Sequence, residues 1–344
     1  MKILQIMGGY SDGGAEIFYI DALSALRNIN IEQYAIVNKK NKKGIKKIEE
    51  LNIPFQAISF NKLFKLPSKY TISKVIKEFK PDIVHYWMGR ACSFLIHGEH
   101  INIGWHIGYR GVKRFRACDY HIALTSELKK HIVSQGIDHN KIYELPIYTH
   151  KNISNQLVRK DFDTPEDKPL LLSLSRLHPV KGLDILLEAM VKVPEAFLWI
   201  AGSGPLKNDL IRQSERLGLK QRVKFLGWRE DKEALMATAD ICVFPSRNDS
   251  FGAVIIESWA ARKTTVACKA PGPLGLISHR KDGILAEIDN AEEFSKSVNE
   301  IINNKMLAKK LANNGYKKFQ KCYTEKVFVR NILAIYTKVL EINK

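Results

Sequence analysis

The sequence lacks the features of a membrane-spanning or disulfide-rich protein. No apolar run approaches the roughly 20 residues that cross a bilayer, and the five cysteines are scattered with no Cys-x-x-Cys pair. An odd number of dispersed cysteines indicates reduced thiols in a cytosolic protein. The stretch MKILQIMGGYSDGG at the N-terminus has too short an apolar core for a signal peptide, so it predicts a first strand that enters a glycine loop.

Acidic residues are scarce relative to basic ones. The 344 residues include 54 Lys and Arg against 36 Asp and Glu, a net charge of +18. Such an excess favours an anionic partner, which can be a nucleic acid, an acidic membrane face or a phosphorylated substrate. The densest basic run, NKKNKKGIKK (38–47), is explained equally well as a solvated loop. No RNA-binding motif accompanies the charge, so we expect no nucleic-acid partner.

Strand and helix patterns alternate along the chain, which is long enough for two cores. Repeated βαβ units of this kind predict an α/β fold with parallel sheets and helices on both faces. Between residues 151 and 168 the pattern lapses into a polar, charged stretch, which predicts a linker. We therefore expect a first Rossmann-like domain over 1–150, a second over 169–324, and a final amphipathic helix over 325–344. Ligands of such doubly wound sheets bind beyond the carboxyl ends of the strands, so we expect a central cleft between two facing domains.

Two loops of the second half carry residues suited to phosphate. SLSRLHPVKG (173–182) places Arg176 and Lys181 just beyond a predicted strand, where a guanidinium fork and an ammonium suit a diphosphate. Taken alone, they are equally well two surface cations. IAGSGPLKNDL (200–210) has a glycine turn at Gly202 and Gly204, but Lys207 occupies the last position of the GxGxxG pattern. An ordinary strand-to-helix turn explains that stretch as well.

The segment NDSFGAVIIESWAA (248–261) joins a predicted strand to a helix that begins near Gly252. The free N–H groups and partial positive charge of a helix N-terminus favour a phosphate, and glycine allows its close approach. Asp249 in the loop is within reach of a sugar hydroxyl. Glu257, one turn into the helix, can accept hydrogen bonds from the two vicinal hydroxyls of a ribose. The alternative is an acid that only favours the helix dipole, with Glu257 solvated.

In their order and spacing these stretches resemble the retaining nucleotide-sugar glycosyltransferases of family 4, which have the GT-B fold. The resemblance covers nearly the whole chain and rests on GGAE (13–16), KPDIVHYW (80–87), SRLHPVKG, LWIAGSGPL, VKFLGW, ADICVFPS and the two acids separated by seven residues. It implies an acceptor domain in the first half and a nucleotide-sugar donor domain in the second. It also implies that the last helix crosses back to the first domain.

The resemblance implies roles for individual residues. Asp249 stands where the family has the first Glu of its E-x7-E motif, so its carboxylate is one methylene shorter. Together with His106 of GWHIGYR (104–110), Asp249 is assigned to catalysis. The residues assigned to the donor diphosphate are Arg176, Lys181, Gly13, Gly14 and Gly252. Those assigned to the donor sugar and ribose are Phe251, Ala253 and Glu257.

No metal or other cofactor is expected beside the donor substrate. DFD (161–163) imitates the DxD metal motif of a different glycosyltransferase fold, but it stands in the predicted linker beside other acids. HGEH (97–100) lacks the HExxH spacing of a metal site. The cations near the diphosphate would instead supply the positive charge that a leaving group needs.

The resulting hypothesis is a retaining, metal-independent glycosyltransferase of lipopolysaccharide or other cell-envelope glycan synthesis. A sugar-nucleotide epimerase or phosphorylase of the same fold stays open as an alternative, as does a non-catalytic basic binding protein. A glycan or lipid-linked acceptor would be reached at the cytoplasmic face of a membrane. Residues that could contact anionic lipid are Lys39, Lys40, Lys42, Lys43, Lys46 and Lys47, with Phe60, Leu63, Phe64 and Leu66 as apolar neighbours that are equally well core residues.

Overall fold

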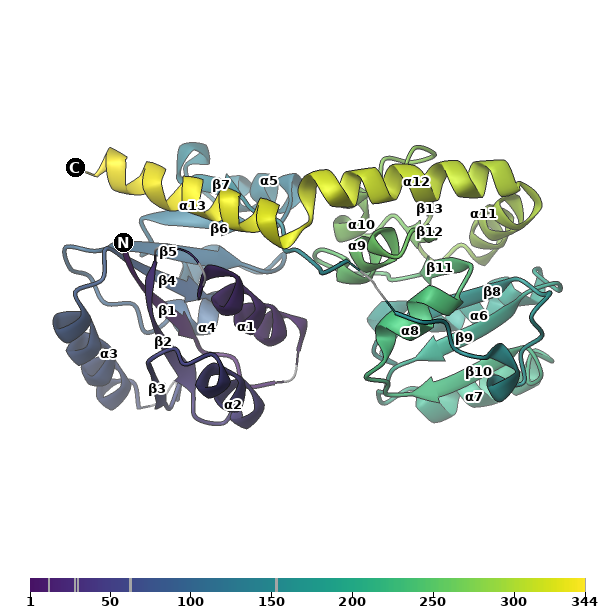
Figure 1. Ribbon diagram of the computed structural model, residues 1–344, viewed down its shortest axis with the longest axis horizontal. Coiled ribbons are helices and arrows are strands. Elements are labelled where there is room, and N and C mark those ends of the chain that lie inside the picture. The colour runs from purple at the N-terminus through teal and green to yellow at the C-terminus, as the bar shows by residue number, and fades with distance from the viewer. Residues whose placement is uncertain (12, 28, 30, 62–63, 152–153, 344) are drawn as a thin grey trace. The chain divides into compact units, whose positions relative to one another are not determined.

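The computed structural model describes residues 1–11, 13–27, 29, 31–61, 64–151 and 154–343. The chain divides into two compact units, of which the first comprises Met1–Ile147 with Glu325–Lys344 and the second comprises Tyr148–Thr324. Each unit is built on its own parallel sheet with helices packed against it (Figure 1). The α/β class predicted from the alternating sequence patterns is confirmed, whereas a cleft between the domains stays a prediction.

In the described part of the first unit, seven parallel strands form one sheet in the order β3-β2-β1-β4-β5-β6-β7. The strands are β1 (Lys2–Met7), β2 (Glu32–Asn38), β3 (Phe55–Ile58), β4 (Ile83–Trp87), β5 (Ile101–His106), β6 (Tyr120–Ala123) and β7 (Ile142–Glu144). The helices are α1 (Gly14–Arg27), α2 (Lys42–Glu50), α3 (Leu66–Phe79), α4 (Met88–Cys92), η1 (Val112–Arg114), α5 (Ser126–Ser134), η2 (His139–Lys141) and α13 (Glu325–Ile342). The chain adds β2 and β3 on one side of β1 and β4 on the other, so the strand order reverses between β1 and β4.

In the described part of the second unit, six parallel strands follow the order β10-β9-β8-β11-β12-β13. The strands are β8 (Leu170–Leu174), β9 (Phe197–Ala201), β10 (Val223–Gly227), β11 (Ile241–Phe244), β12 (Thr264–Cys268) and β13 (Ile284–Ala286). The helices are η3 (Arg159–Phe162), η4 (Pro179–Lys181), α6 (Leu183–Val191), α7 (Lys207–Arg216), α8 (Lys232–Thr238), α9 (Ala253–Ala260), α10 (Pro271–Leu276), α11 (Ala291–Asn303) and α12 (Lys305–Cys322). Here the order reverses between β8 and β11.

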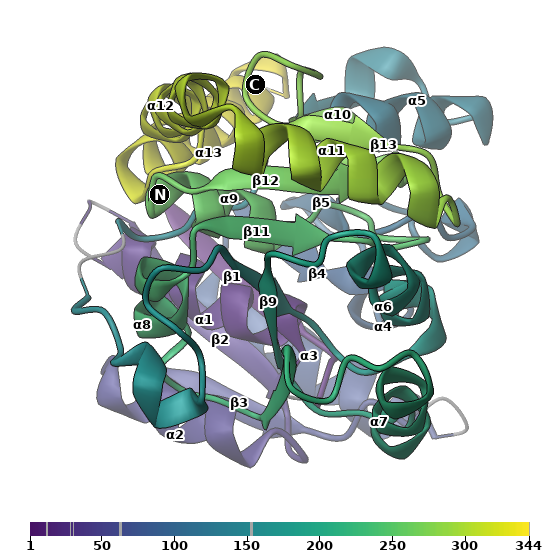
Figure 2. The same cartoon turned by 90° about the vertical axis from the view of Figure 1, so that its right-hand side faces the viewer.

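The alternation of side chains along β8 divides the core of the second unit into two layers. Leu171 belongs to the cluster that covers α6, α7 and α11, whereas Leu170 and Leu172 belong to the cluster on the side of α8. Figure 2 shows α6 and α7 on one side of the sheet and α8 on the other. A strand buried on both faces needs a nearly continuous apolar run, which the sequence LLLSL of β8 supplies.

The last helix, α13, packs on the first unit (Figure 1). The ring of Phe328 meets that of Phe18 edge-on with their centroids 5.3 Å apart. The hydroxyl of Tyr336 lies 2.7 Å from Nδ1 of the fully buried His85. His85 also stacks on Trp87, with 4.8 Å between ring centroids, so this histidine is part of the core. Burial lowers the pKa of His85 to about 3, which keeps its ring neutral at physiological pH.

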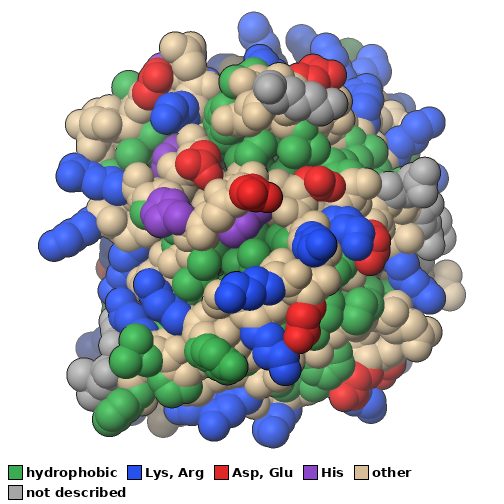
Figure 3. Space-filling model, turned by 90° about the vertical axis from the view of Figure 1, so that its left-hand side faces the viewer, with side chains coloured by type: hydrophobic (Ala, Val, Ile, Leu, Met, Phe, Trp, Pro, Cys, Tyr) green, Lys and Arg blue, Asp and Glu red, His purple; other side chains and the backbone are tan. Residues whose placement is uncertain are grey.

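The start of α3 exposes large apolar side chains on the surface of the first unit. Phe64, Leu66 and Tyr70 are 71%, 82% and 74% exposed. Of the apolar residues predicted near a membrane, Phe60 instead packs in the core at 6% exposure, and Leu63 lies outside the described residues. Figure 3 views the molecule from the side of this unit. In the lower part of this view, hydrophobic side chains lie beside those of Lys and Arg.

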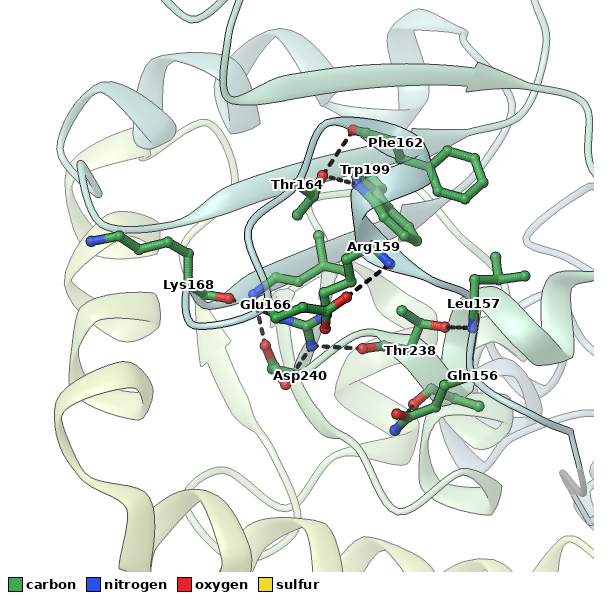
Figure 4. A network of polar contacts seen from close by, with 12 residues as sticks. Gln156, Leu157, Arg159, Phe162, Thr164, Glu166, Lys168, Trp199, Thr238 and Asp240 are labelled. Carbon is green, nitrogen blue, oxygen red and sulfur yellow. Dashed lines mark hydrogen bonds and ion pairs between the residues drawn. The ribbon is translucent and has the colours of Figure 1, made fainter.

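The predicted linker over 151–168 is wrong for its larger part, because residues 154–168 pack against the second unit. The guanidinium of Arg159 donates to the carbonyl oxygens of Lys168 (2.9 Å) and Thr238 (2.8 Å). It also forms an ion pair with Asp240 at 3.0 Å (Figure 4). The indole N–H of Trp199 donates to the hydroxyl of Thr164 at 2.9 Å. Composition cannot distinguish this segment from a linker, since its partners lie far away in the sequence.

Most of the basic run at 38–47, residues 42–47, lies in a helix rather than in a loop. Helix α2 begins at Lys42, and the side chain of Asn41 caps it by accepting a hydrogen bond from the N–H of Gly44 at 2.9 Å. Such a cap satisfies one of the free N–H groups at a helix start. Four lysines of this run belong to α2, and Ile48 of the same helix is buried. These four are Lys42, Lys43, Lys46 and Lys47.

Candidate functional site

Two neighbouring strands of the second unit bring the predicted donor residues together. Arg176 follows β8, Lys181 ends the short helix η4, and Asp249 lies in the loop between β11 and α9. Strands β8 and β11 pair in parallel, so their carboxyl ends lie at the same edge of the sheet. The strand order reverses between these two strands, and ligands of doubly wound sheets bind beyond such a point.

Lys181 and Asp249 form an ion pair with 2.5 Å between Nζ and Oδ2. Their side chains are only 13% and 19% exposed. The other carboxylate oxygen of Asp249 accepts the backbone N–H of Phe251 at 3.1 Å. Because both oxygens are engaged, the acid is fixed in orientation, and it holds the ammonium group of Lys181 beside the start of α9.

Arg176 differs from Lys181 in its surroundings. Its side chain is exposed, and no described residue forms a hydrogen bond or an ion pair with it. A guanidinium without a protein partner keeps its five donors available for a ligand. Arg176 and Lys181 therefore supply one free and one anchored cation at the carboxyl end of β8.

Arg247 anchors the loop that carries Lys181. Its guanidinium forms two hydrogen bonds with Asp184 at 2.8 and 2.6 Å and one with Asp289 at 2.6 Å. It also donates to the carbonyl oxygen of Pro179 at 2.7 Å. Burial alone would raise the pKa of Asp184, but the hydrogen bonds from Arg247 outweigh it, so the pKa is lowered. The residue was not predicted because these partners come from distant segments.

The glycine turn after β9 is explained by packing against the Arg176 loop. A Cβ atom on Gly202 would lie 1.9 Å from the carbonyl oxygen of Ser175, and one on Gly204 would lie 2.3 Å from that of Leu177. The N–H of Leu177 donates to the carbonyl oxygen of Ser203 at 2.9 Å. The turn thus supports the backbone on either side of Arg176, and no side chain fits in this contact.

Helix α9 begins at Ala253 after a left-handed residue, Gly252, whose φ is 93°. An L side chain rarely adopts this conformation, so glycine is required at the helix start. Phe251 is buried and meets the ring of Tyr323 edge-on, with 6.3 Å between centroids. The first N–H groups of α9 follow directly on the loop that carries Asp249, the ion-pair partner of Lys181.

Glu257 lies one turn into α9, with 20% of its side chain exposed. Its Oε1 accepts a hydrogen bond from the ammonium of Lys232 in α8 at 2.7 Å. Glu257 is therefore neither fully solvated nor unpaired, and its cationic partner was not predicted from the sequence. Lys232 is 48% exposed, so a ligand that approaches Glu257 also approaches an accessible ammonium group.

In the first unit, Gly13 and Gly14 lie where the chain passes from β1 to α1. The carbonyl oxygen of Gly13 accepts the N–H groups of Glu16 and Ile17, both at 3.1 Å, and so starts the helix. A pocket of about 590 Å³ lies beside this turn, and its lining includes Ser11 and Glu16. The pocket is also lined by residues that follow β4 and β5, so it lies beyond the carboxyl ends of three neighbouring strands.

His106, at the end of β5, is only 2% exposed. Its Nε2 lies 3.1 Å from Nδ1 of His121, and its ring stacks on Phe115 with centroids 3.7 Å apart. Burial, with smaller contributions from His121 and His131, lowers the pKa of His106 to about 3. The ring is therefore neutral at physiological pH and behaves as a hydrogen-bonding group. The adjacent Ile107 lines the pocket, but a role of His106 in catalysis stays a prediction.

Two further observations concern metals and membranes. Among the described residues, no three His, Cys, Asp or Glu side chains come together in a group suited to a metal ion. Of the DFD stretch, Asp163 forms an ion pair with Lys224 at 3.1 Å. No described helix combines the length and the apolar character that crossing a membrane requires.

Comparisons with known proteins agree with this architecture. Residues 154–318 match the family model of the glycosyl transferases group 1. The chain is 28% identical over 326 residues to the lipopolysaccharide core biosynthesis glycosyltransferase LpsE of Rhizobium meliloti (strain 1021), which covers 92% of this chain and 93% of LpsE. This similarity extends over both units.

Solved structures resemble the whole chain. Anabaena Alr3699/HepE in complex with UDP has a TM-score of 0.87 at 21% identity, covering 98% of this chain and 100% of HepE. The apo form of the lipopolysaccharide outer core galactosyltransferase WaaB has a TM-score of 0.79 at 22% identity, covering 98% and 100%. The chain therefore has the GT-B fold predicted from its motifs, and residues 154–318 of its second unit are similar to the glycosyl transferases group 1.

Proposed function

We propose that this protein is a retaining, metal-independent glycosyltransferase that moves a sugar from a nucleoside diphosphate sugar to an acceptor hydroxyl. The observation that carries the proposal is the Lys181–Asp249 ion pair, which stands next to the start of α9 inside the group 1 domain. A cation, a fixed carboxylate and free helix N–H groups in one place suit a sugar joined to a diphosphate. HepE has been solved with UDP-glucose, which supports a nucleotide-sugar donor for this chain as well.

In this proposal the negative charge of the leaving diphosphate is stabilised by Arg176, Lys181 and the N-terminus of α9. The departing nucleoside diphosphate gains negative charge, and cations held in place before the reaction stabilise that charge without reorganisation. Arg247 acts as a positioning residue, because it fixes the backbone at Pro179 and the helix start at Asp184. Asp249 would face the donor sugar, and Glu257 the ribose hydroxyls.

Retention at the sugar carbon is proposed from the resemblance to family 4. Two carboxylates are placed near the helix start, but both are engaged with lysines, at 2.5 Å for Asp249 and 2.7 Å for Glu257. Neither is arranged as a free nucleophile. The proposed step therefore forms the new bond on the face from which the diphosphate leaves, and the leaving phosphate accepts the proton of the acceptor hydroxyl.

The acceptor is proposed to be a lipopolysaccharide-type or other cell-envelope glycan, presented at the cytoplasmic face of a membrane. The similarity to LpsE, whose name assigns it to lipopolysaccharide core biosynthesis, supports this class. The exposed Phe64, Leu66 and Tyr70 beside lysines suit an anionic bilayer surface. Co-sedimentation with anionic vesicles should fall when these three residues become serine, whereas Met306→Ser, at an 85% exposed position of the second unit, should change nothing. Equal binding to neutral and anionic vesicles would remove the membrane part of the proposal.

A thermal-shift screen in EDTA with UDP, GDP, ADP and their sugars tests the donor assignment. One nucleotide should raise the melting temperature, since a ligand at 100 times its Kd adds about 2.7 kcal/mol to stability. Product analysis with a glycan acceptor then separates transfer from epimerisation and phosphorolysis. If none of the nucleotides stabilises the protein, the proposed function fails.

A further inference from the structure

The charged side chains that line the pocket of the first unit are mostly basic. Arg90, Arg110, Lys113 and Arg114 line it, and the only acid among its lining residues in the described chain is Glu16. Arg90 belongs to α4, which follows β4, and the other three belong to the segment that follows β5. Two separate segments therefore bring positive charge to one hollow.

Among the described residues, no carboxylate lies within ion-pair distance of any of these four cations. Lys181, in contrast, is paired with Asp249 at 2.5 Å. Arg90 instead lies 4.8 Å from the ring centroid of Tyr10. The carboxylate of Glu16 is buried and accepts the hydroxyl of Ser11 at 2.8 Å. Four like charges around a hollow repel one another, and an anionic ligand offsets that repulsion.

The location of the pocket is one where ligands bind. It lies beyond the carboxyl ends of β1, β4 and β5, and the strand order of this sheet reverses between β1 and β4. Open α/β sheets bind ligands at this reversal. A volume of about 590 Å³ also falls in the range of sites for sugars and other small molecules, so the pocket is too large for a simple ion alone.

We propose that this pocket binds the acceptor sugar through an anionic group, a phosphate monoester or a carboxylate, that the sugar carries. The inference rests on the proposed function and names the class of its acceptor. Three of the cations are arginines, whose planar guanidinium matches both anions with paired hydrogen bonds. The cations proposed for the donor diphosphate, Arg176 and Lys181, lie in the second unit, so the four cations of this pocket are additional to them.

Calorimetric titration tests the proposal with glucose 6-phosphate, glucuronate and glucose as probes. The titrations are made with UDP, GDP or ADP, whichever binds, at saturation, so that the diphosphate position is filled. Glucose 6-phosphate or glucuronate should bind at least about ten-fold more tightly than glucose, because each charge-assisted contact is lost in the neutral sugar. The stronger of the two anions identifies which group the acceptor carries.

The variant Arg110→Gln/Arg114→Gln should lose at least about ten-fold in affinity for the anionic probe while its nucleotide affinity is unchanged. Arg116→Gln is the matched control, since it is exposed in the same segment but does not line the pocket. In the unmodified protein, raising the salt concentration should weaken the binding of the anionic probe and leave the binding of glucose unchanged. This second measurement does not depend on the folding of a variant.

Equal binding of the anionic probes and glucose would overturn the proposal. Unchanged binding of the anionic probe by the double variant would overturn it as well, as would competitive displacement of the probe by the nucleotide. Loss of probe binding in Lys181→Ala with retention in the double variant would also overturn it, because the anion would then sit at the donor position. Absence of all nucleotide binding, with probe binding still dependent on Arg110 and Arg114, would end the proposed transferase function but leave the anion site standing.

Discussion

The ammonium of Lys181 lies 2.5 Å from the carboxylate of Asp249, although the two residues are 68 positions apart. Each therefore fixes the other beside the start of α9. A substitution at either position has two effects, one on a ligand and one on the partner that is left unpaired in a site with little solvent exposure. Experiments on this pair need variants that separate the two.

The first prediction concerns the diphosphate. Arg176→Ala and Lys181→Ala should each weaken nucleoside diphosphate binding by about 1.5–3 kcal/mol, the scale of a charge-assisted hydrogen bond. Calorimetry with the nucleotide selected by the thermal screen measures this loss. Asp249→Asn leaves Lys181 in place without its charged partner, so it should retain diphosphate binding. Unchanged affinity in a folded Arg176→Ala/Lys181→Ala variant would refute the assignment, and Arg212→Ala, on the exposed side of α7, serves as the control.

The second prediction concerns the ribose. If Glu257 accepts the ribose hydroxyls, the unmodified protein should bind the ribonucleotide about ten-fold more tightly than its 2′-deoxy form, and Glu257→Gln should abolish this difference. Glu233→Gln is a matched control, because Glu233 also lies near Lys232, at 3.9 Å. If Glu257→Gln keeps the preference for the ribonucleotide, another residue binds the ribose hydroxyls.

The third prediction is that transfer continues in excess EDTA. The cations at the diphosphate are expected to supply the charge that a metal ion provides elsewhere. Activity with and without chelator, at equal donor concentration, measures this. If EDTA stops the reaction and Mg²⁺ or Mn²⁺ restores it, the metal-independent mechanism is wrong.

The fourth prediction concerns acid stability. The pKa of His85 is lowered to about 3 by burial, below the ordinary value of 6.5 that applies in the unfolded chain. Between these values the unfolded state binds the extra proton, so the free energy of unfolding should decrease as pH falls below about 6.5. From pH 7 to pH 5 this histidine alone should account for about 2 kcal/mol.

Urea unfolding followed by tryptophan fluorescence at pH 7 and pH 5 measures this effect. The variant His85→Phe/Tyr336→Phe removes the titrating ring together with the hydroxyl that bonds to it, so it should lose less stability on acidification than the parent. His139→Gln, at an exposed position, should behave like the parent. Equal pH dependence in all three proteins would contradict the assignment.

Local patterns of the sequence predicted most strands and helices, because apolar periodicity and helix ends are local properties. The strand at 2–7 and the helix at 325–342 are examples with bounds that agree to within two residues. Contacts between distant segments were not predictable in this way. The segment around Arg159 has the composition of a linker, yet partners 79 and 81 residues away hold it on the second unit.

In the candidate site, too, residues with a local pattern were predicted and contacts between distant segments were not. Arg176, Lys181 and Asp249 were identified because they follow predicted strands, and their common sheet edge follows from the topology. The contact of Lys232 with Glu257 was not predictable, because the two residues lie in different helices and no local pattern links them. The deep burial of His106 against Phe115 could likewise not be inferred from its place after a strand, since the same position is compatible with an exposed ring.

The most direct test of the central claim is proton NMR of the donor reaction in EDTA, with the nucleotide sugar that stabilises the protein and a phosphorylated glycan acceptor. We predict release of the nucleoside diphosphate and a product whose new glycosidic bond has the anomeric configuration of the donor. A product with the opposite configuration would contradict the retaining mechanism. Donor that stays uncleaved with every UDP-, GDP- and ADP-sugar would contradict the transferase assignment itself.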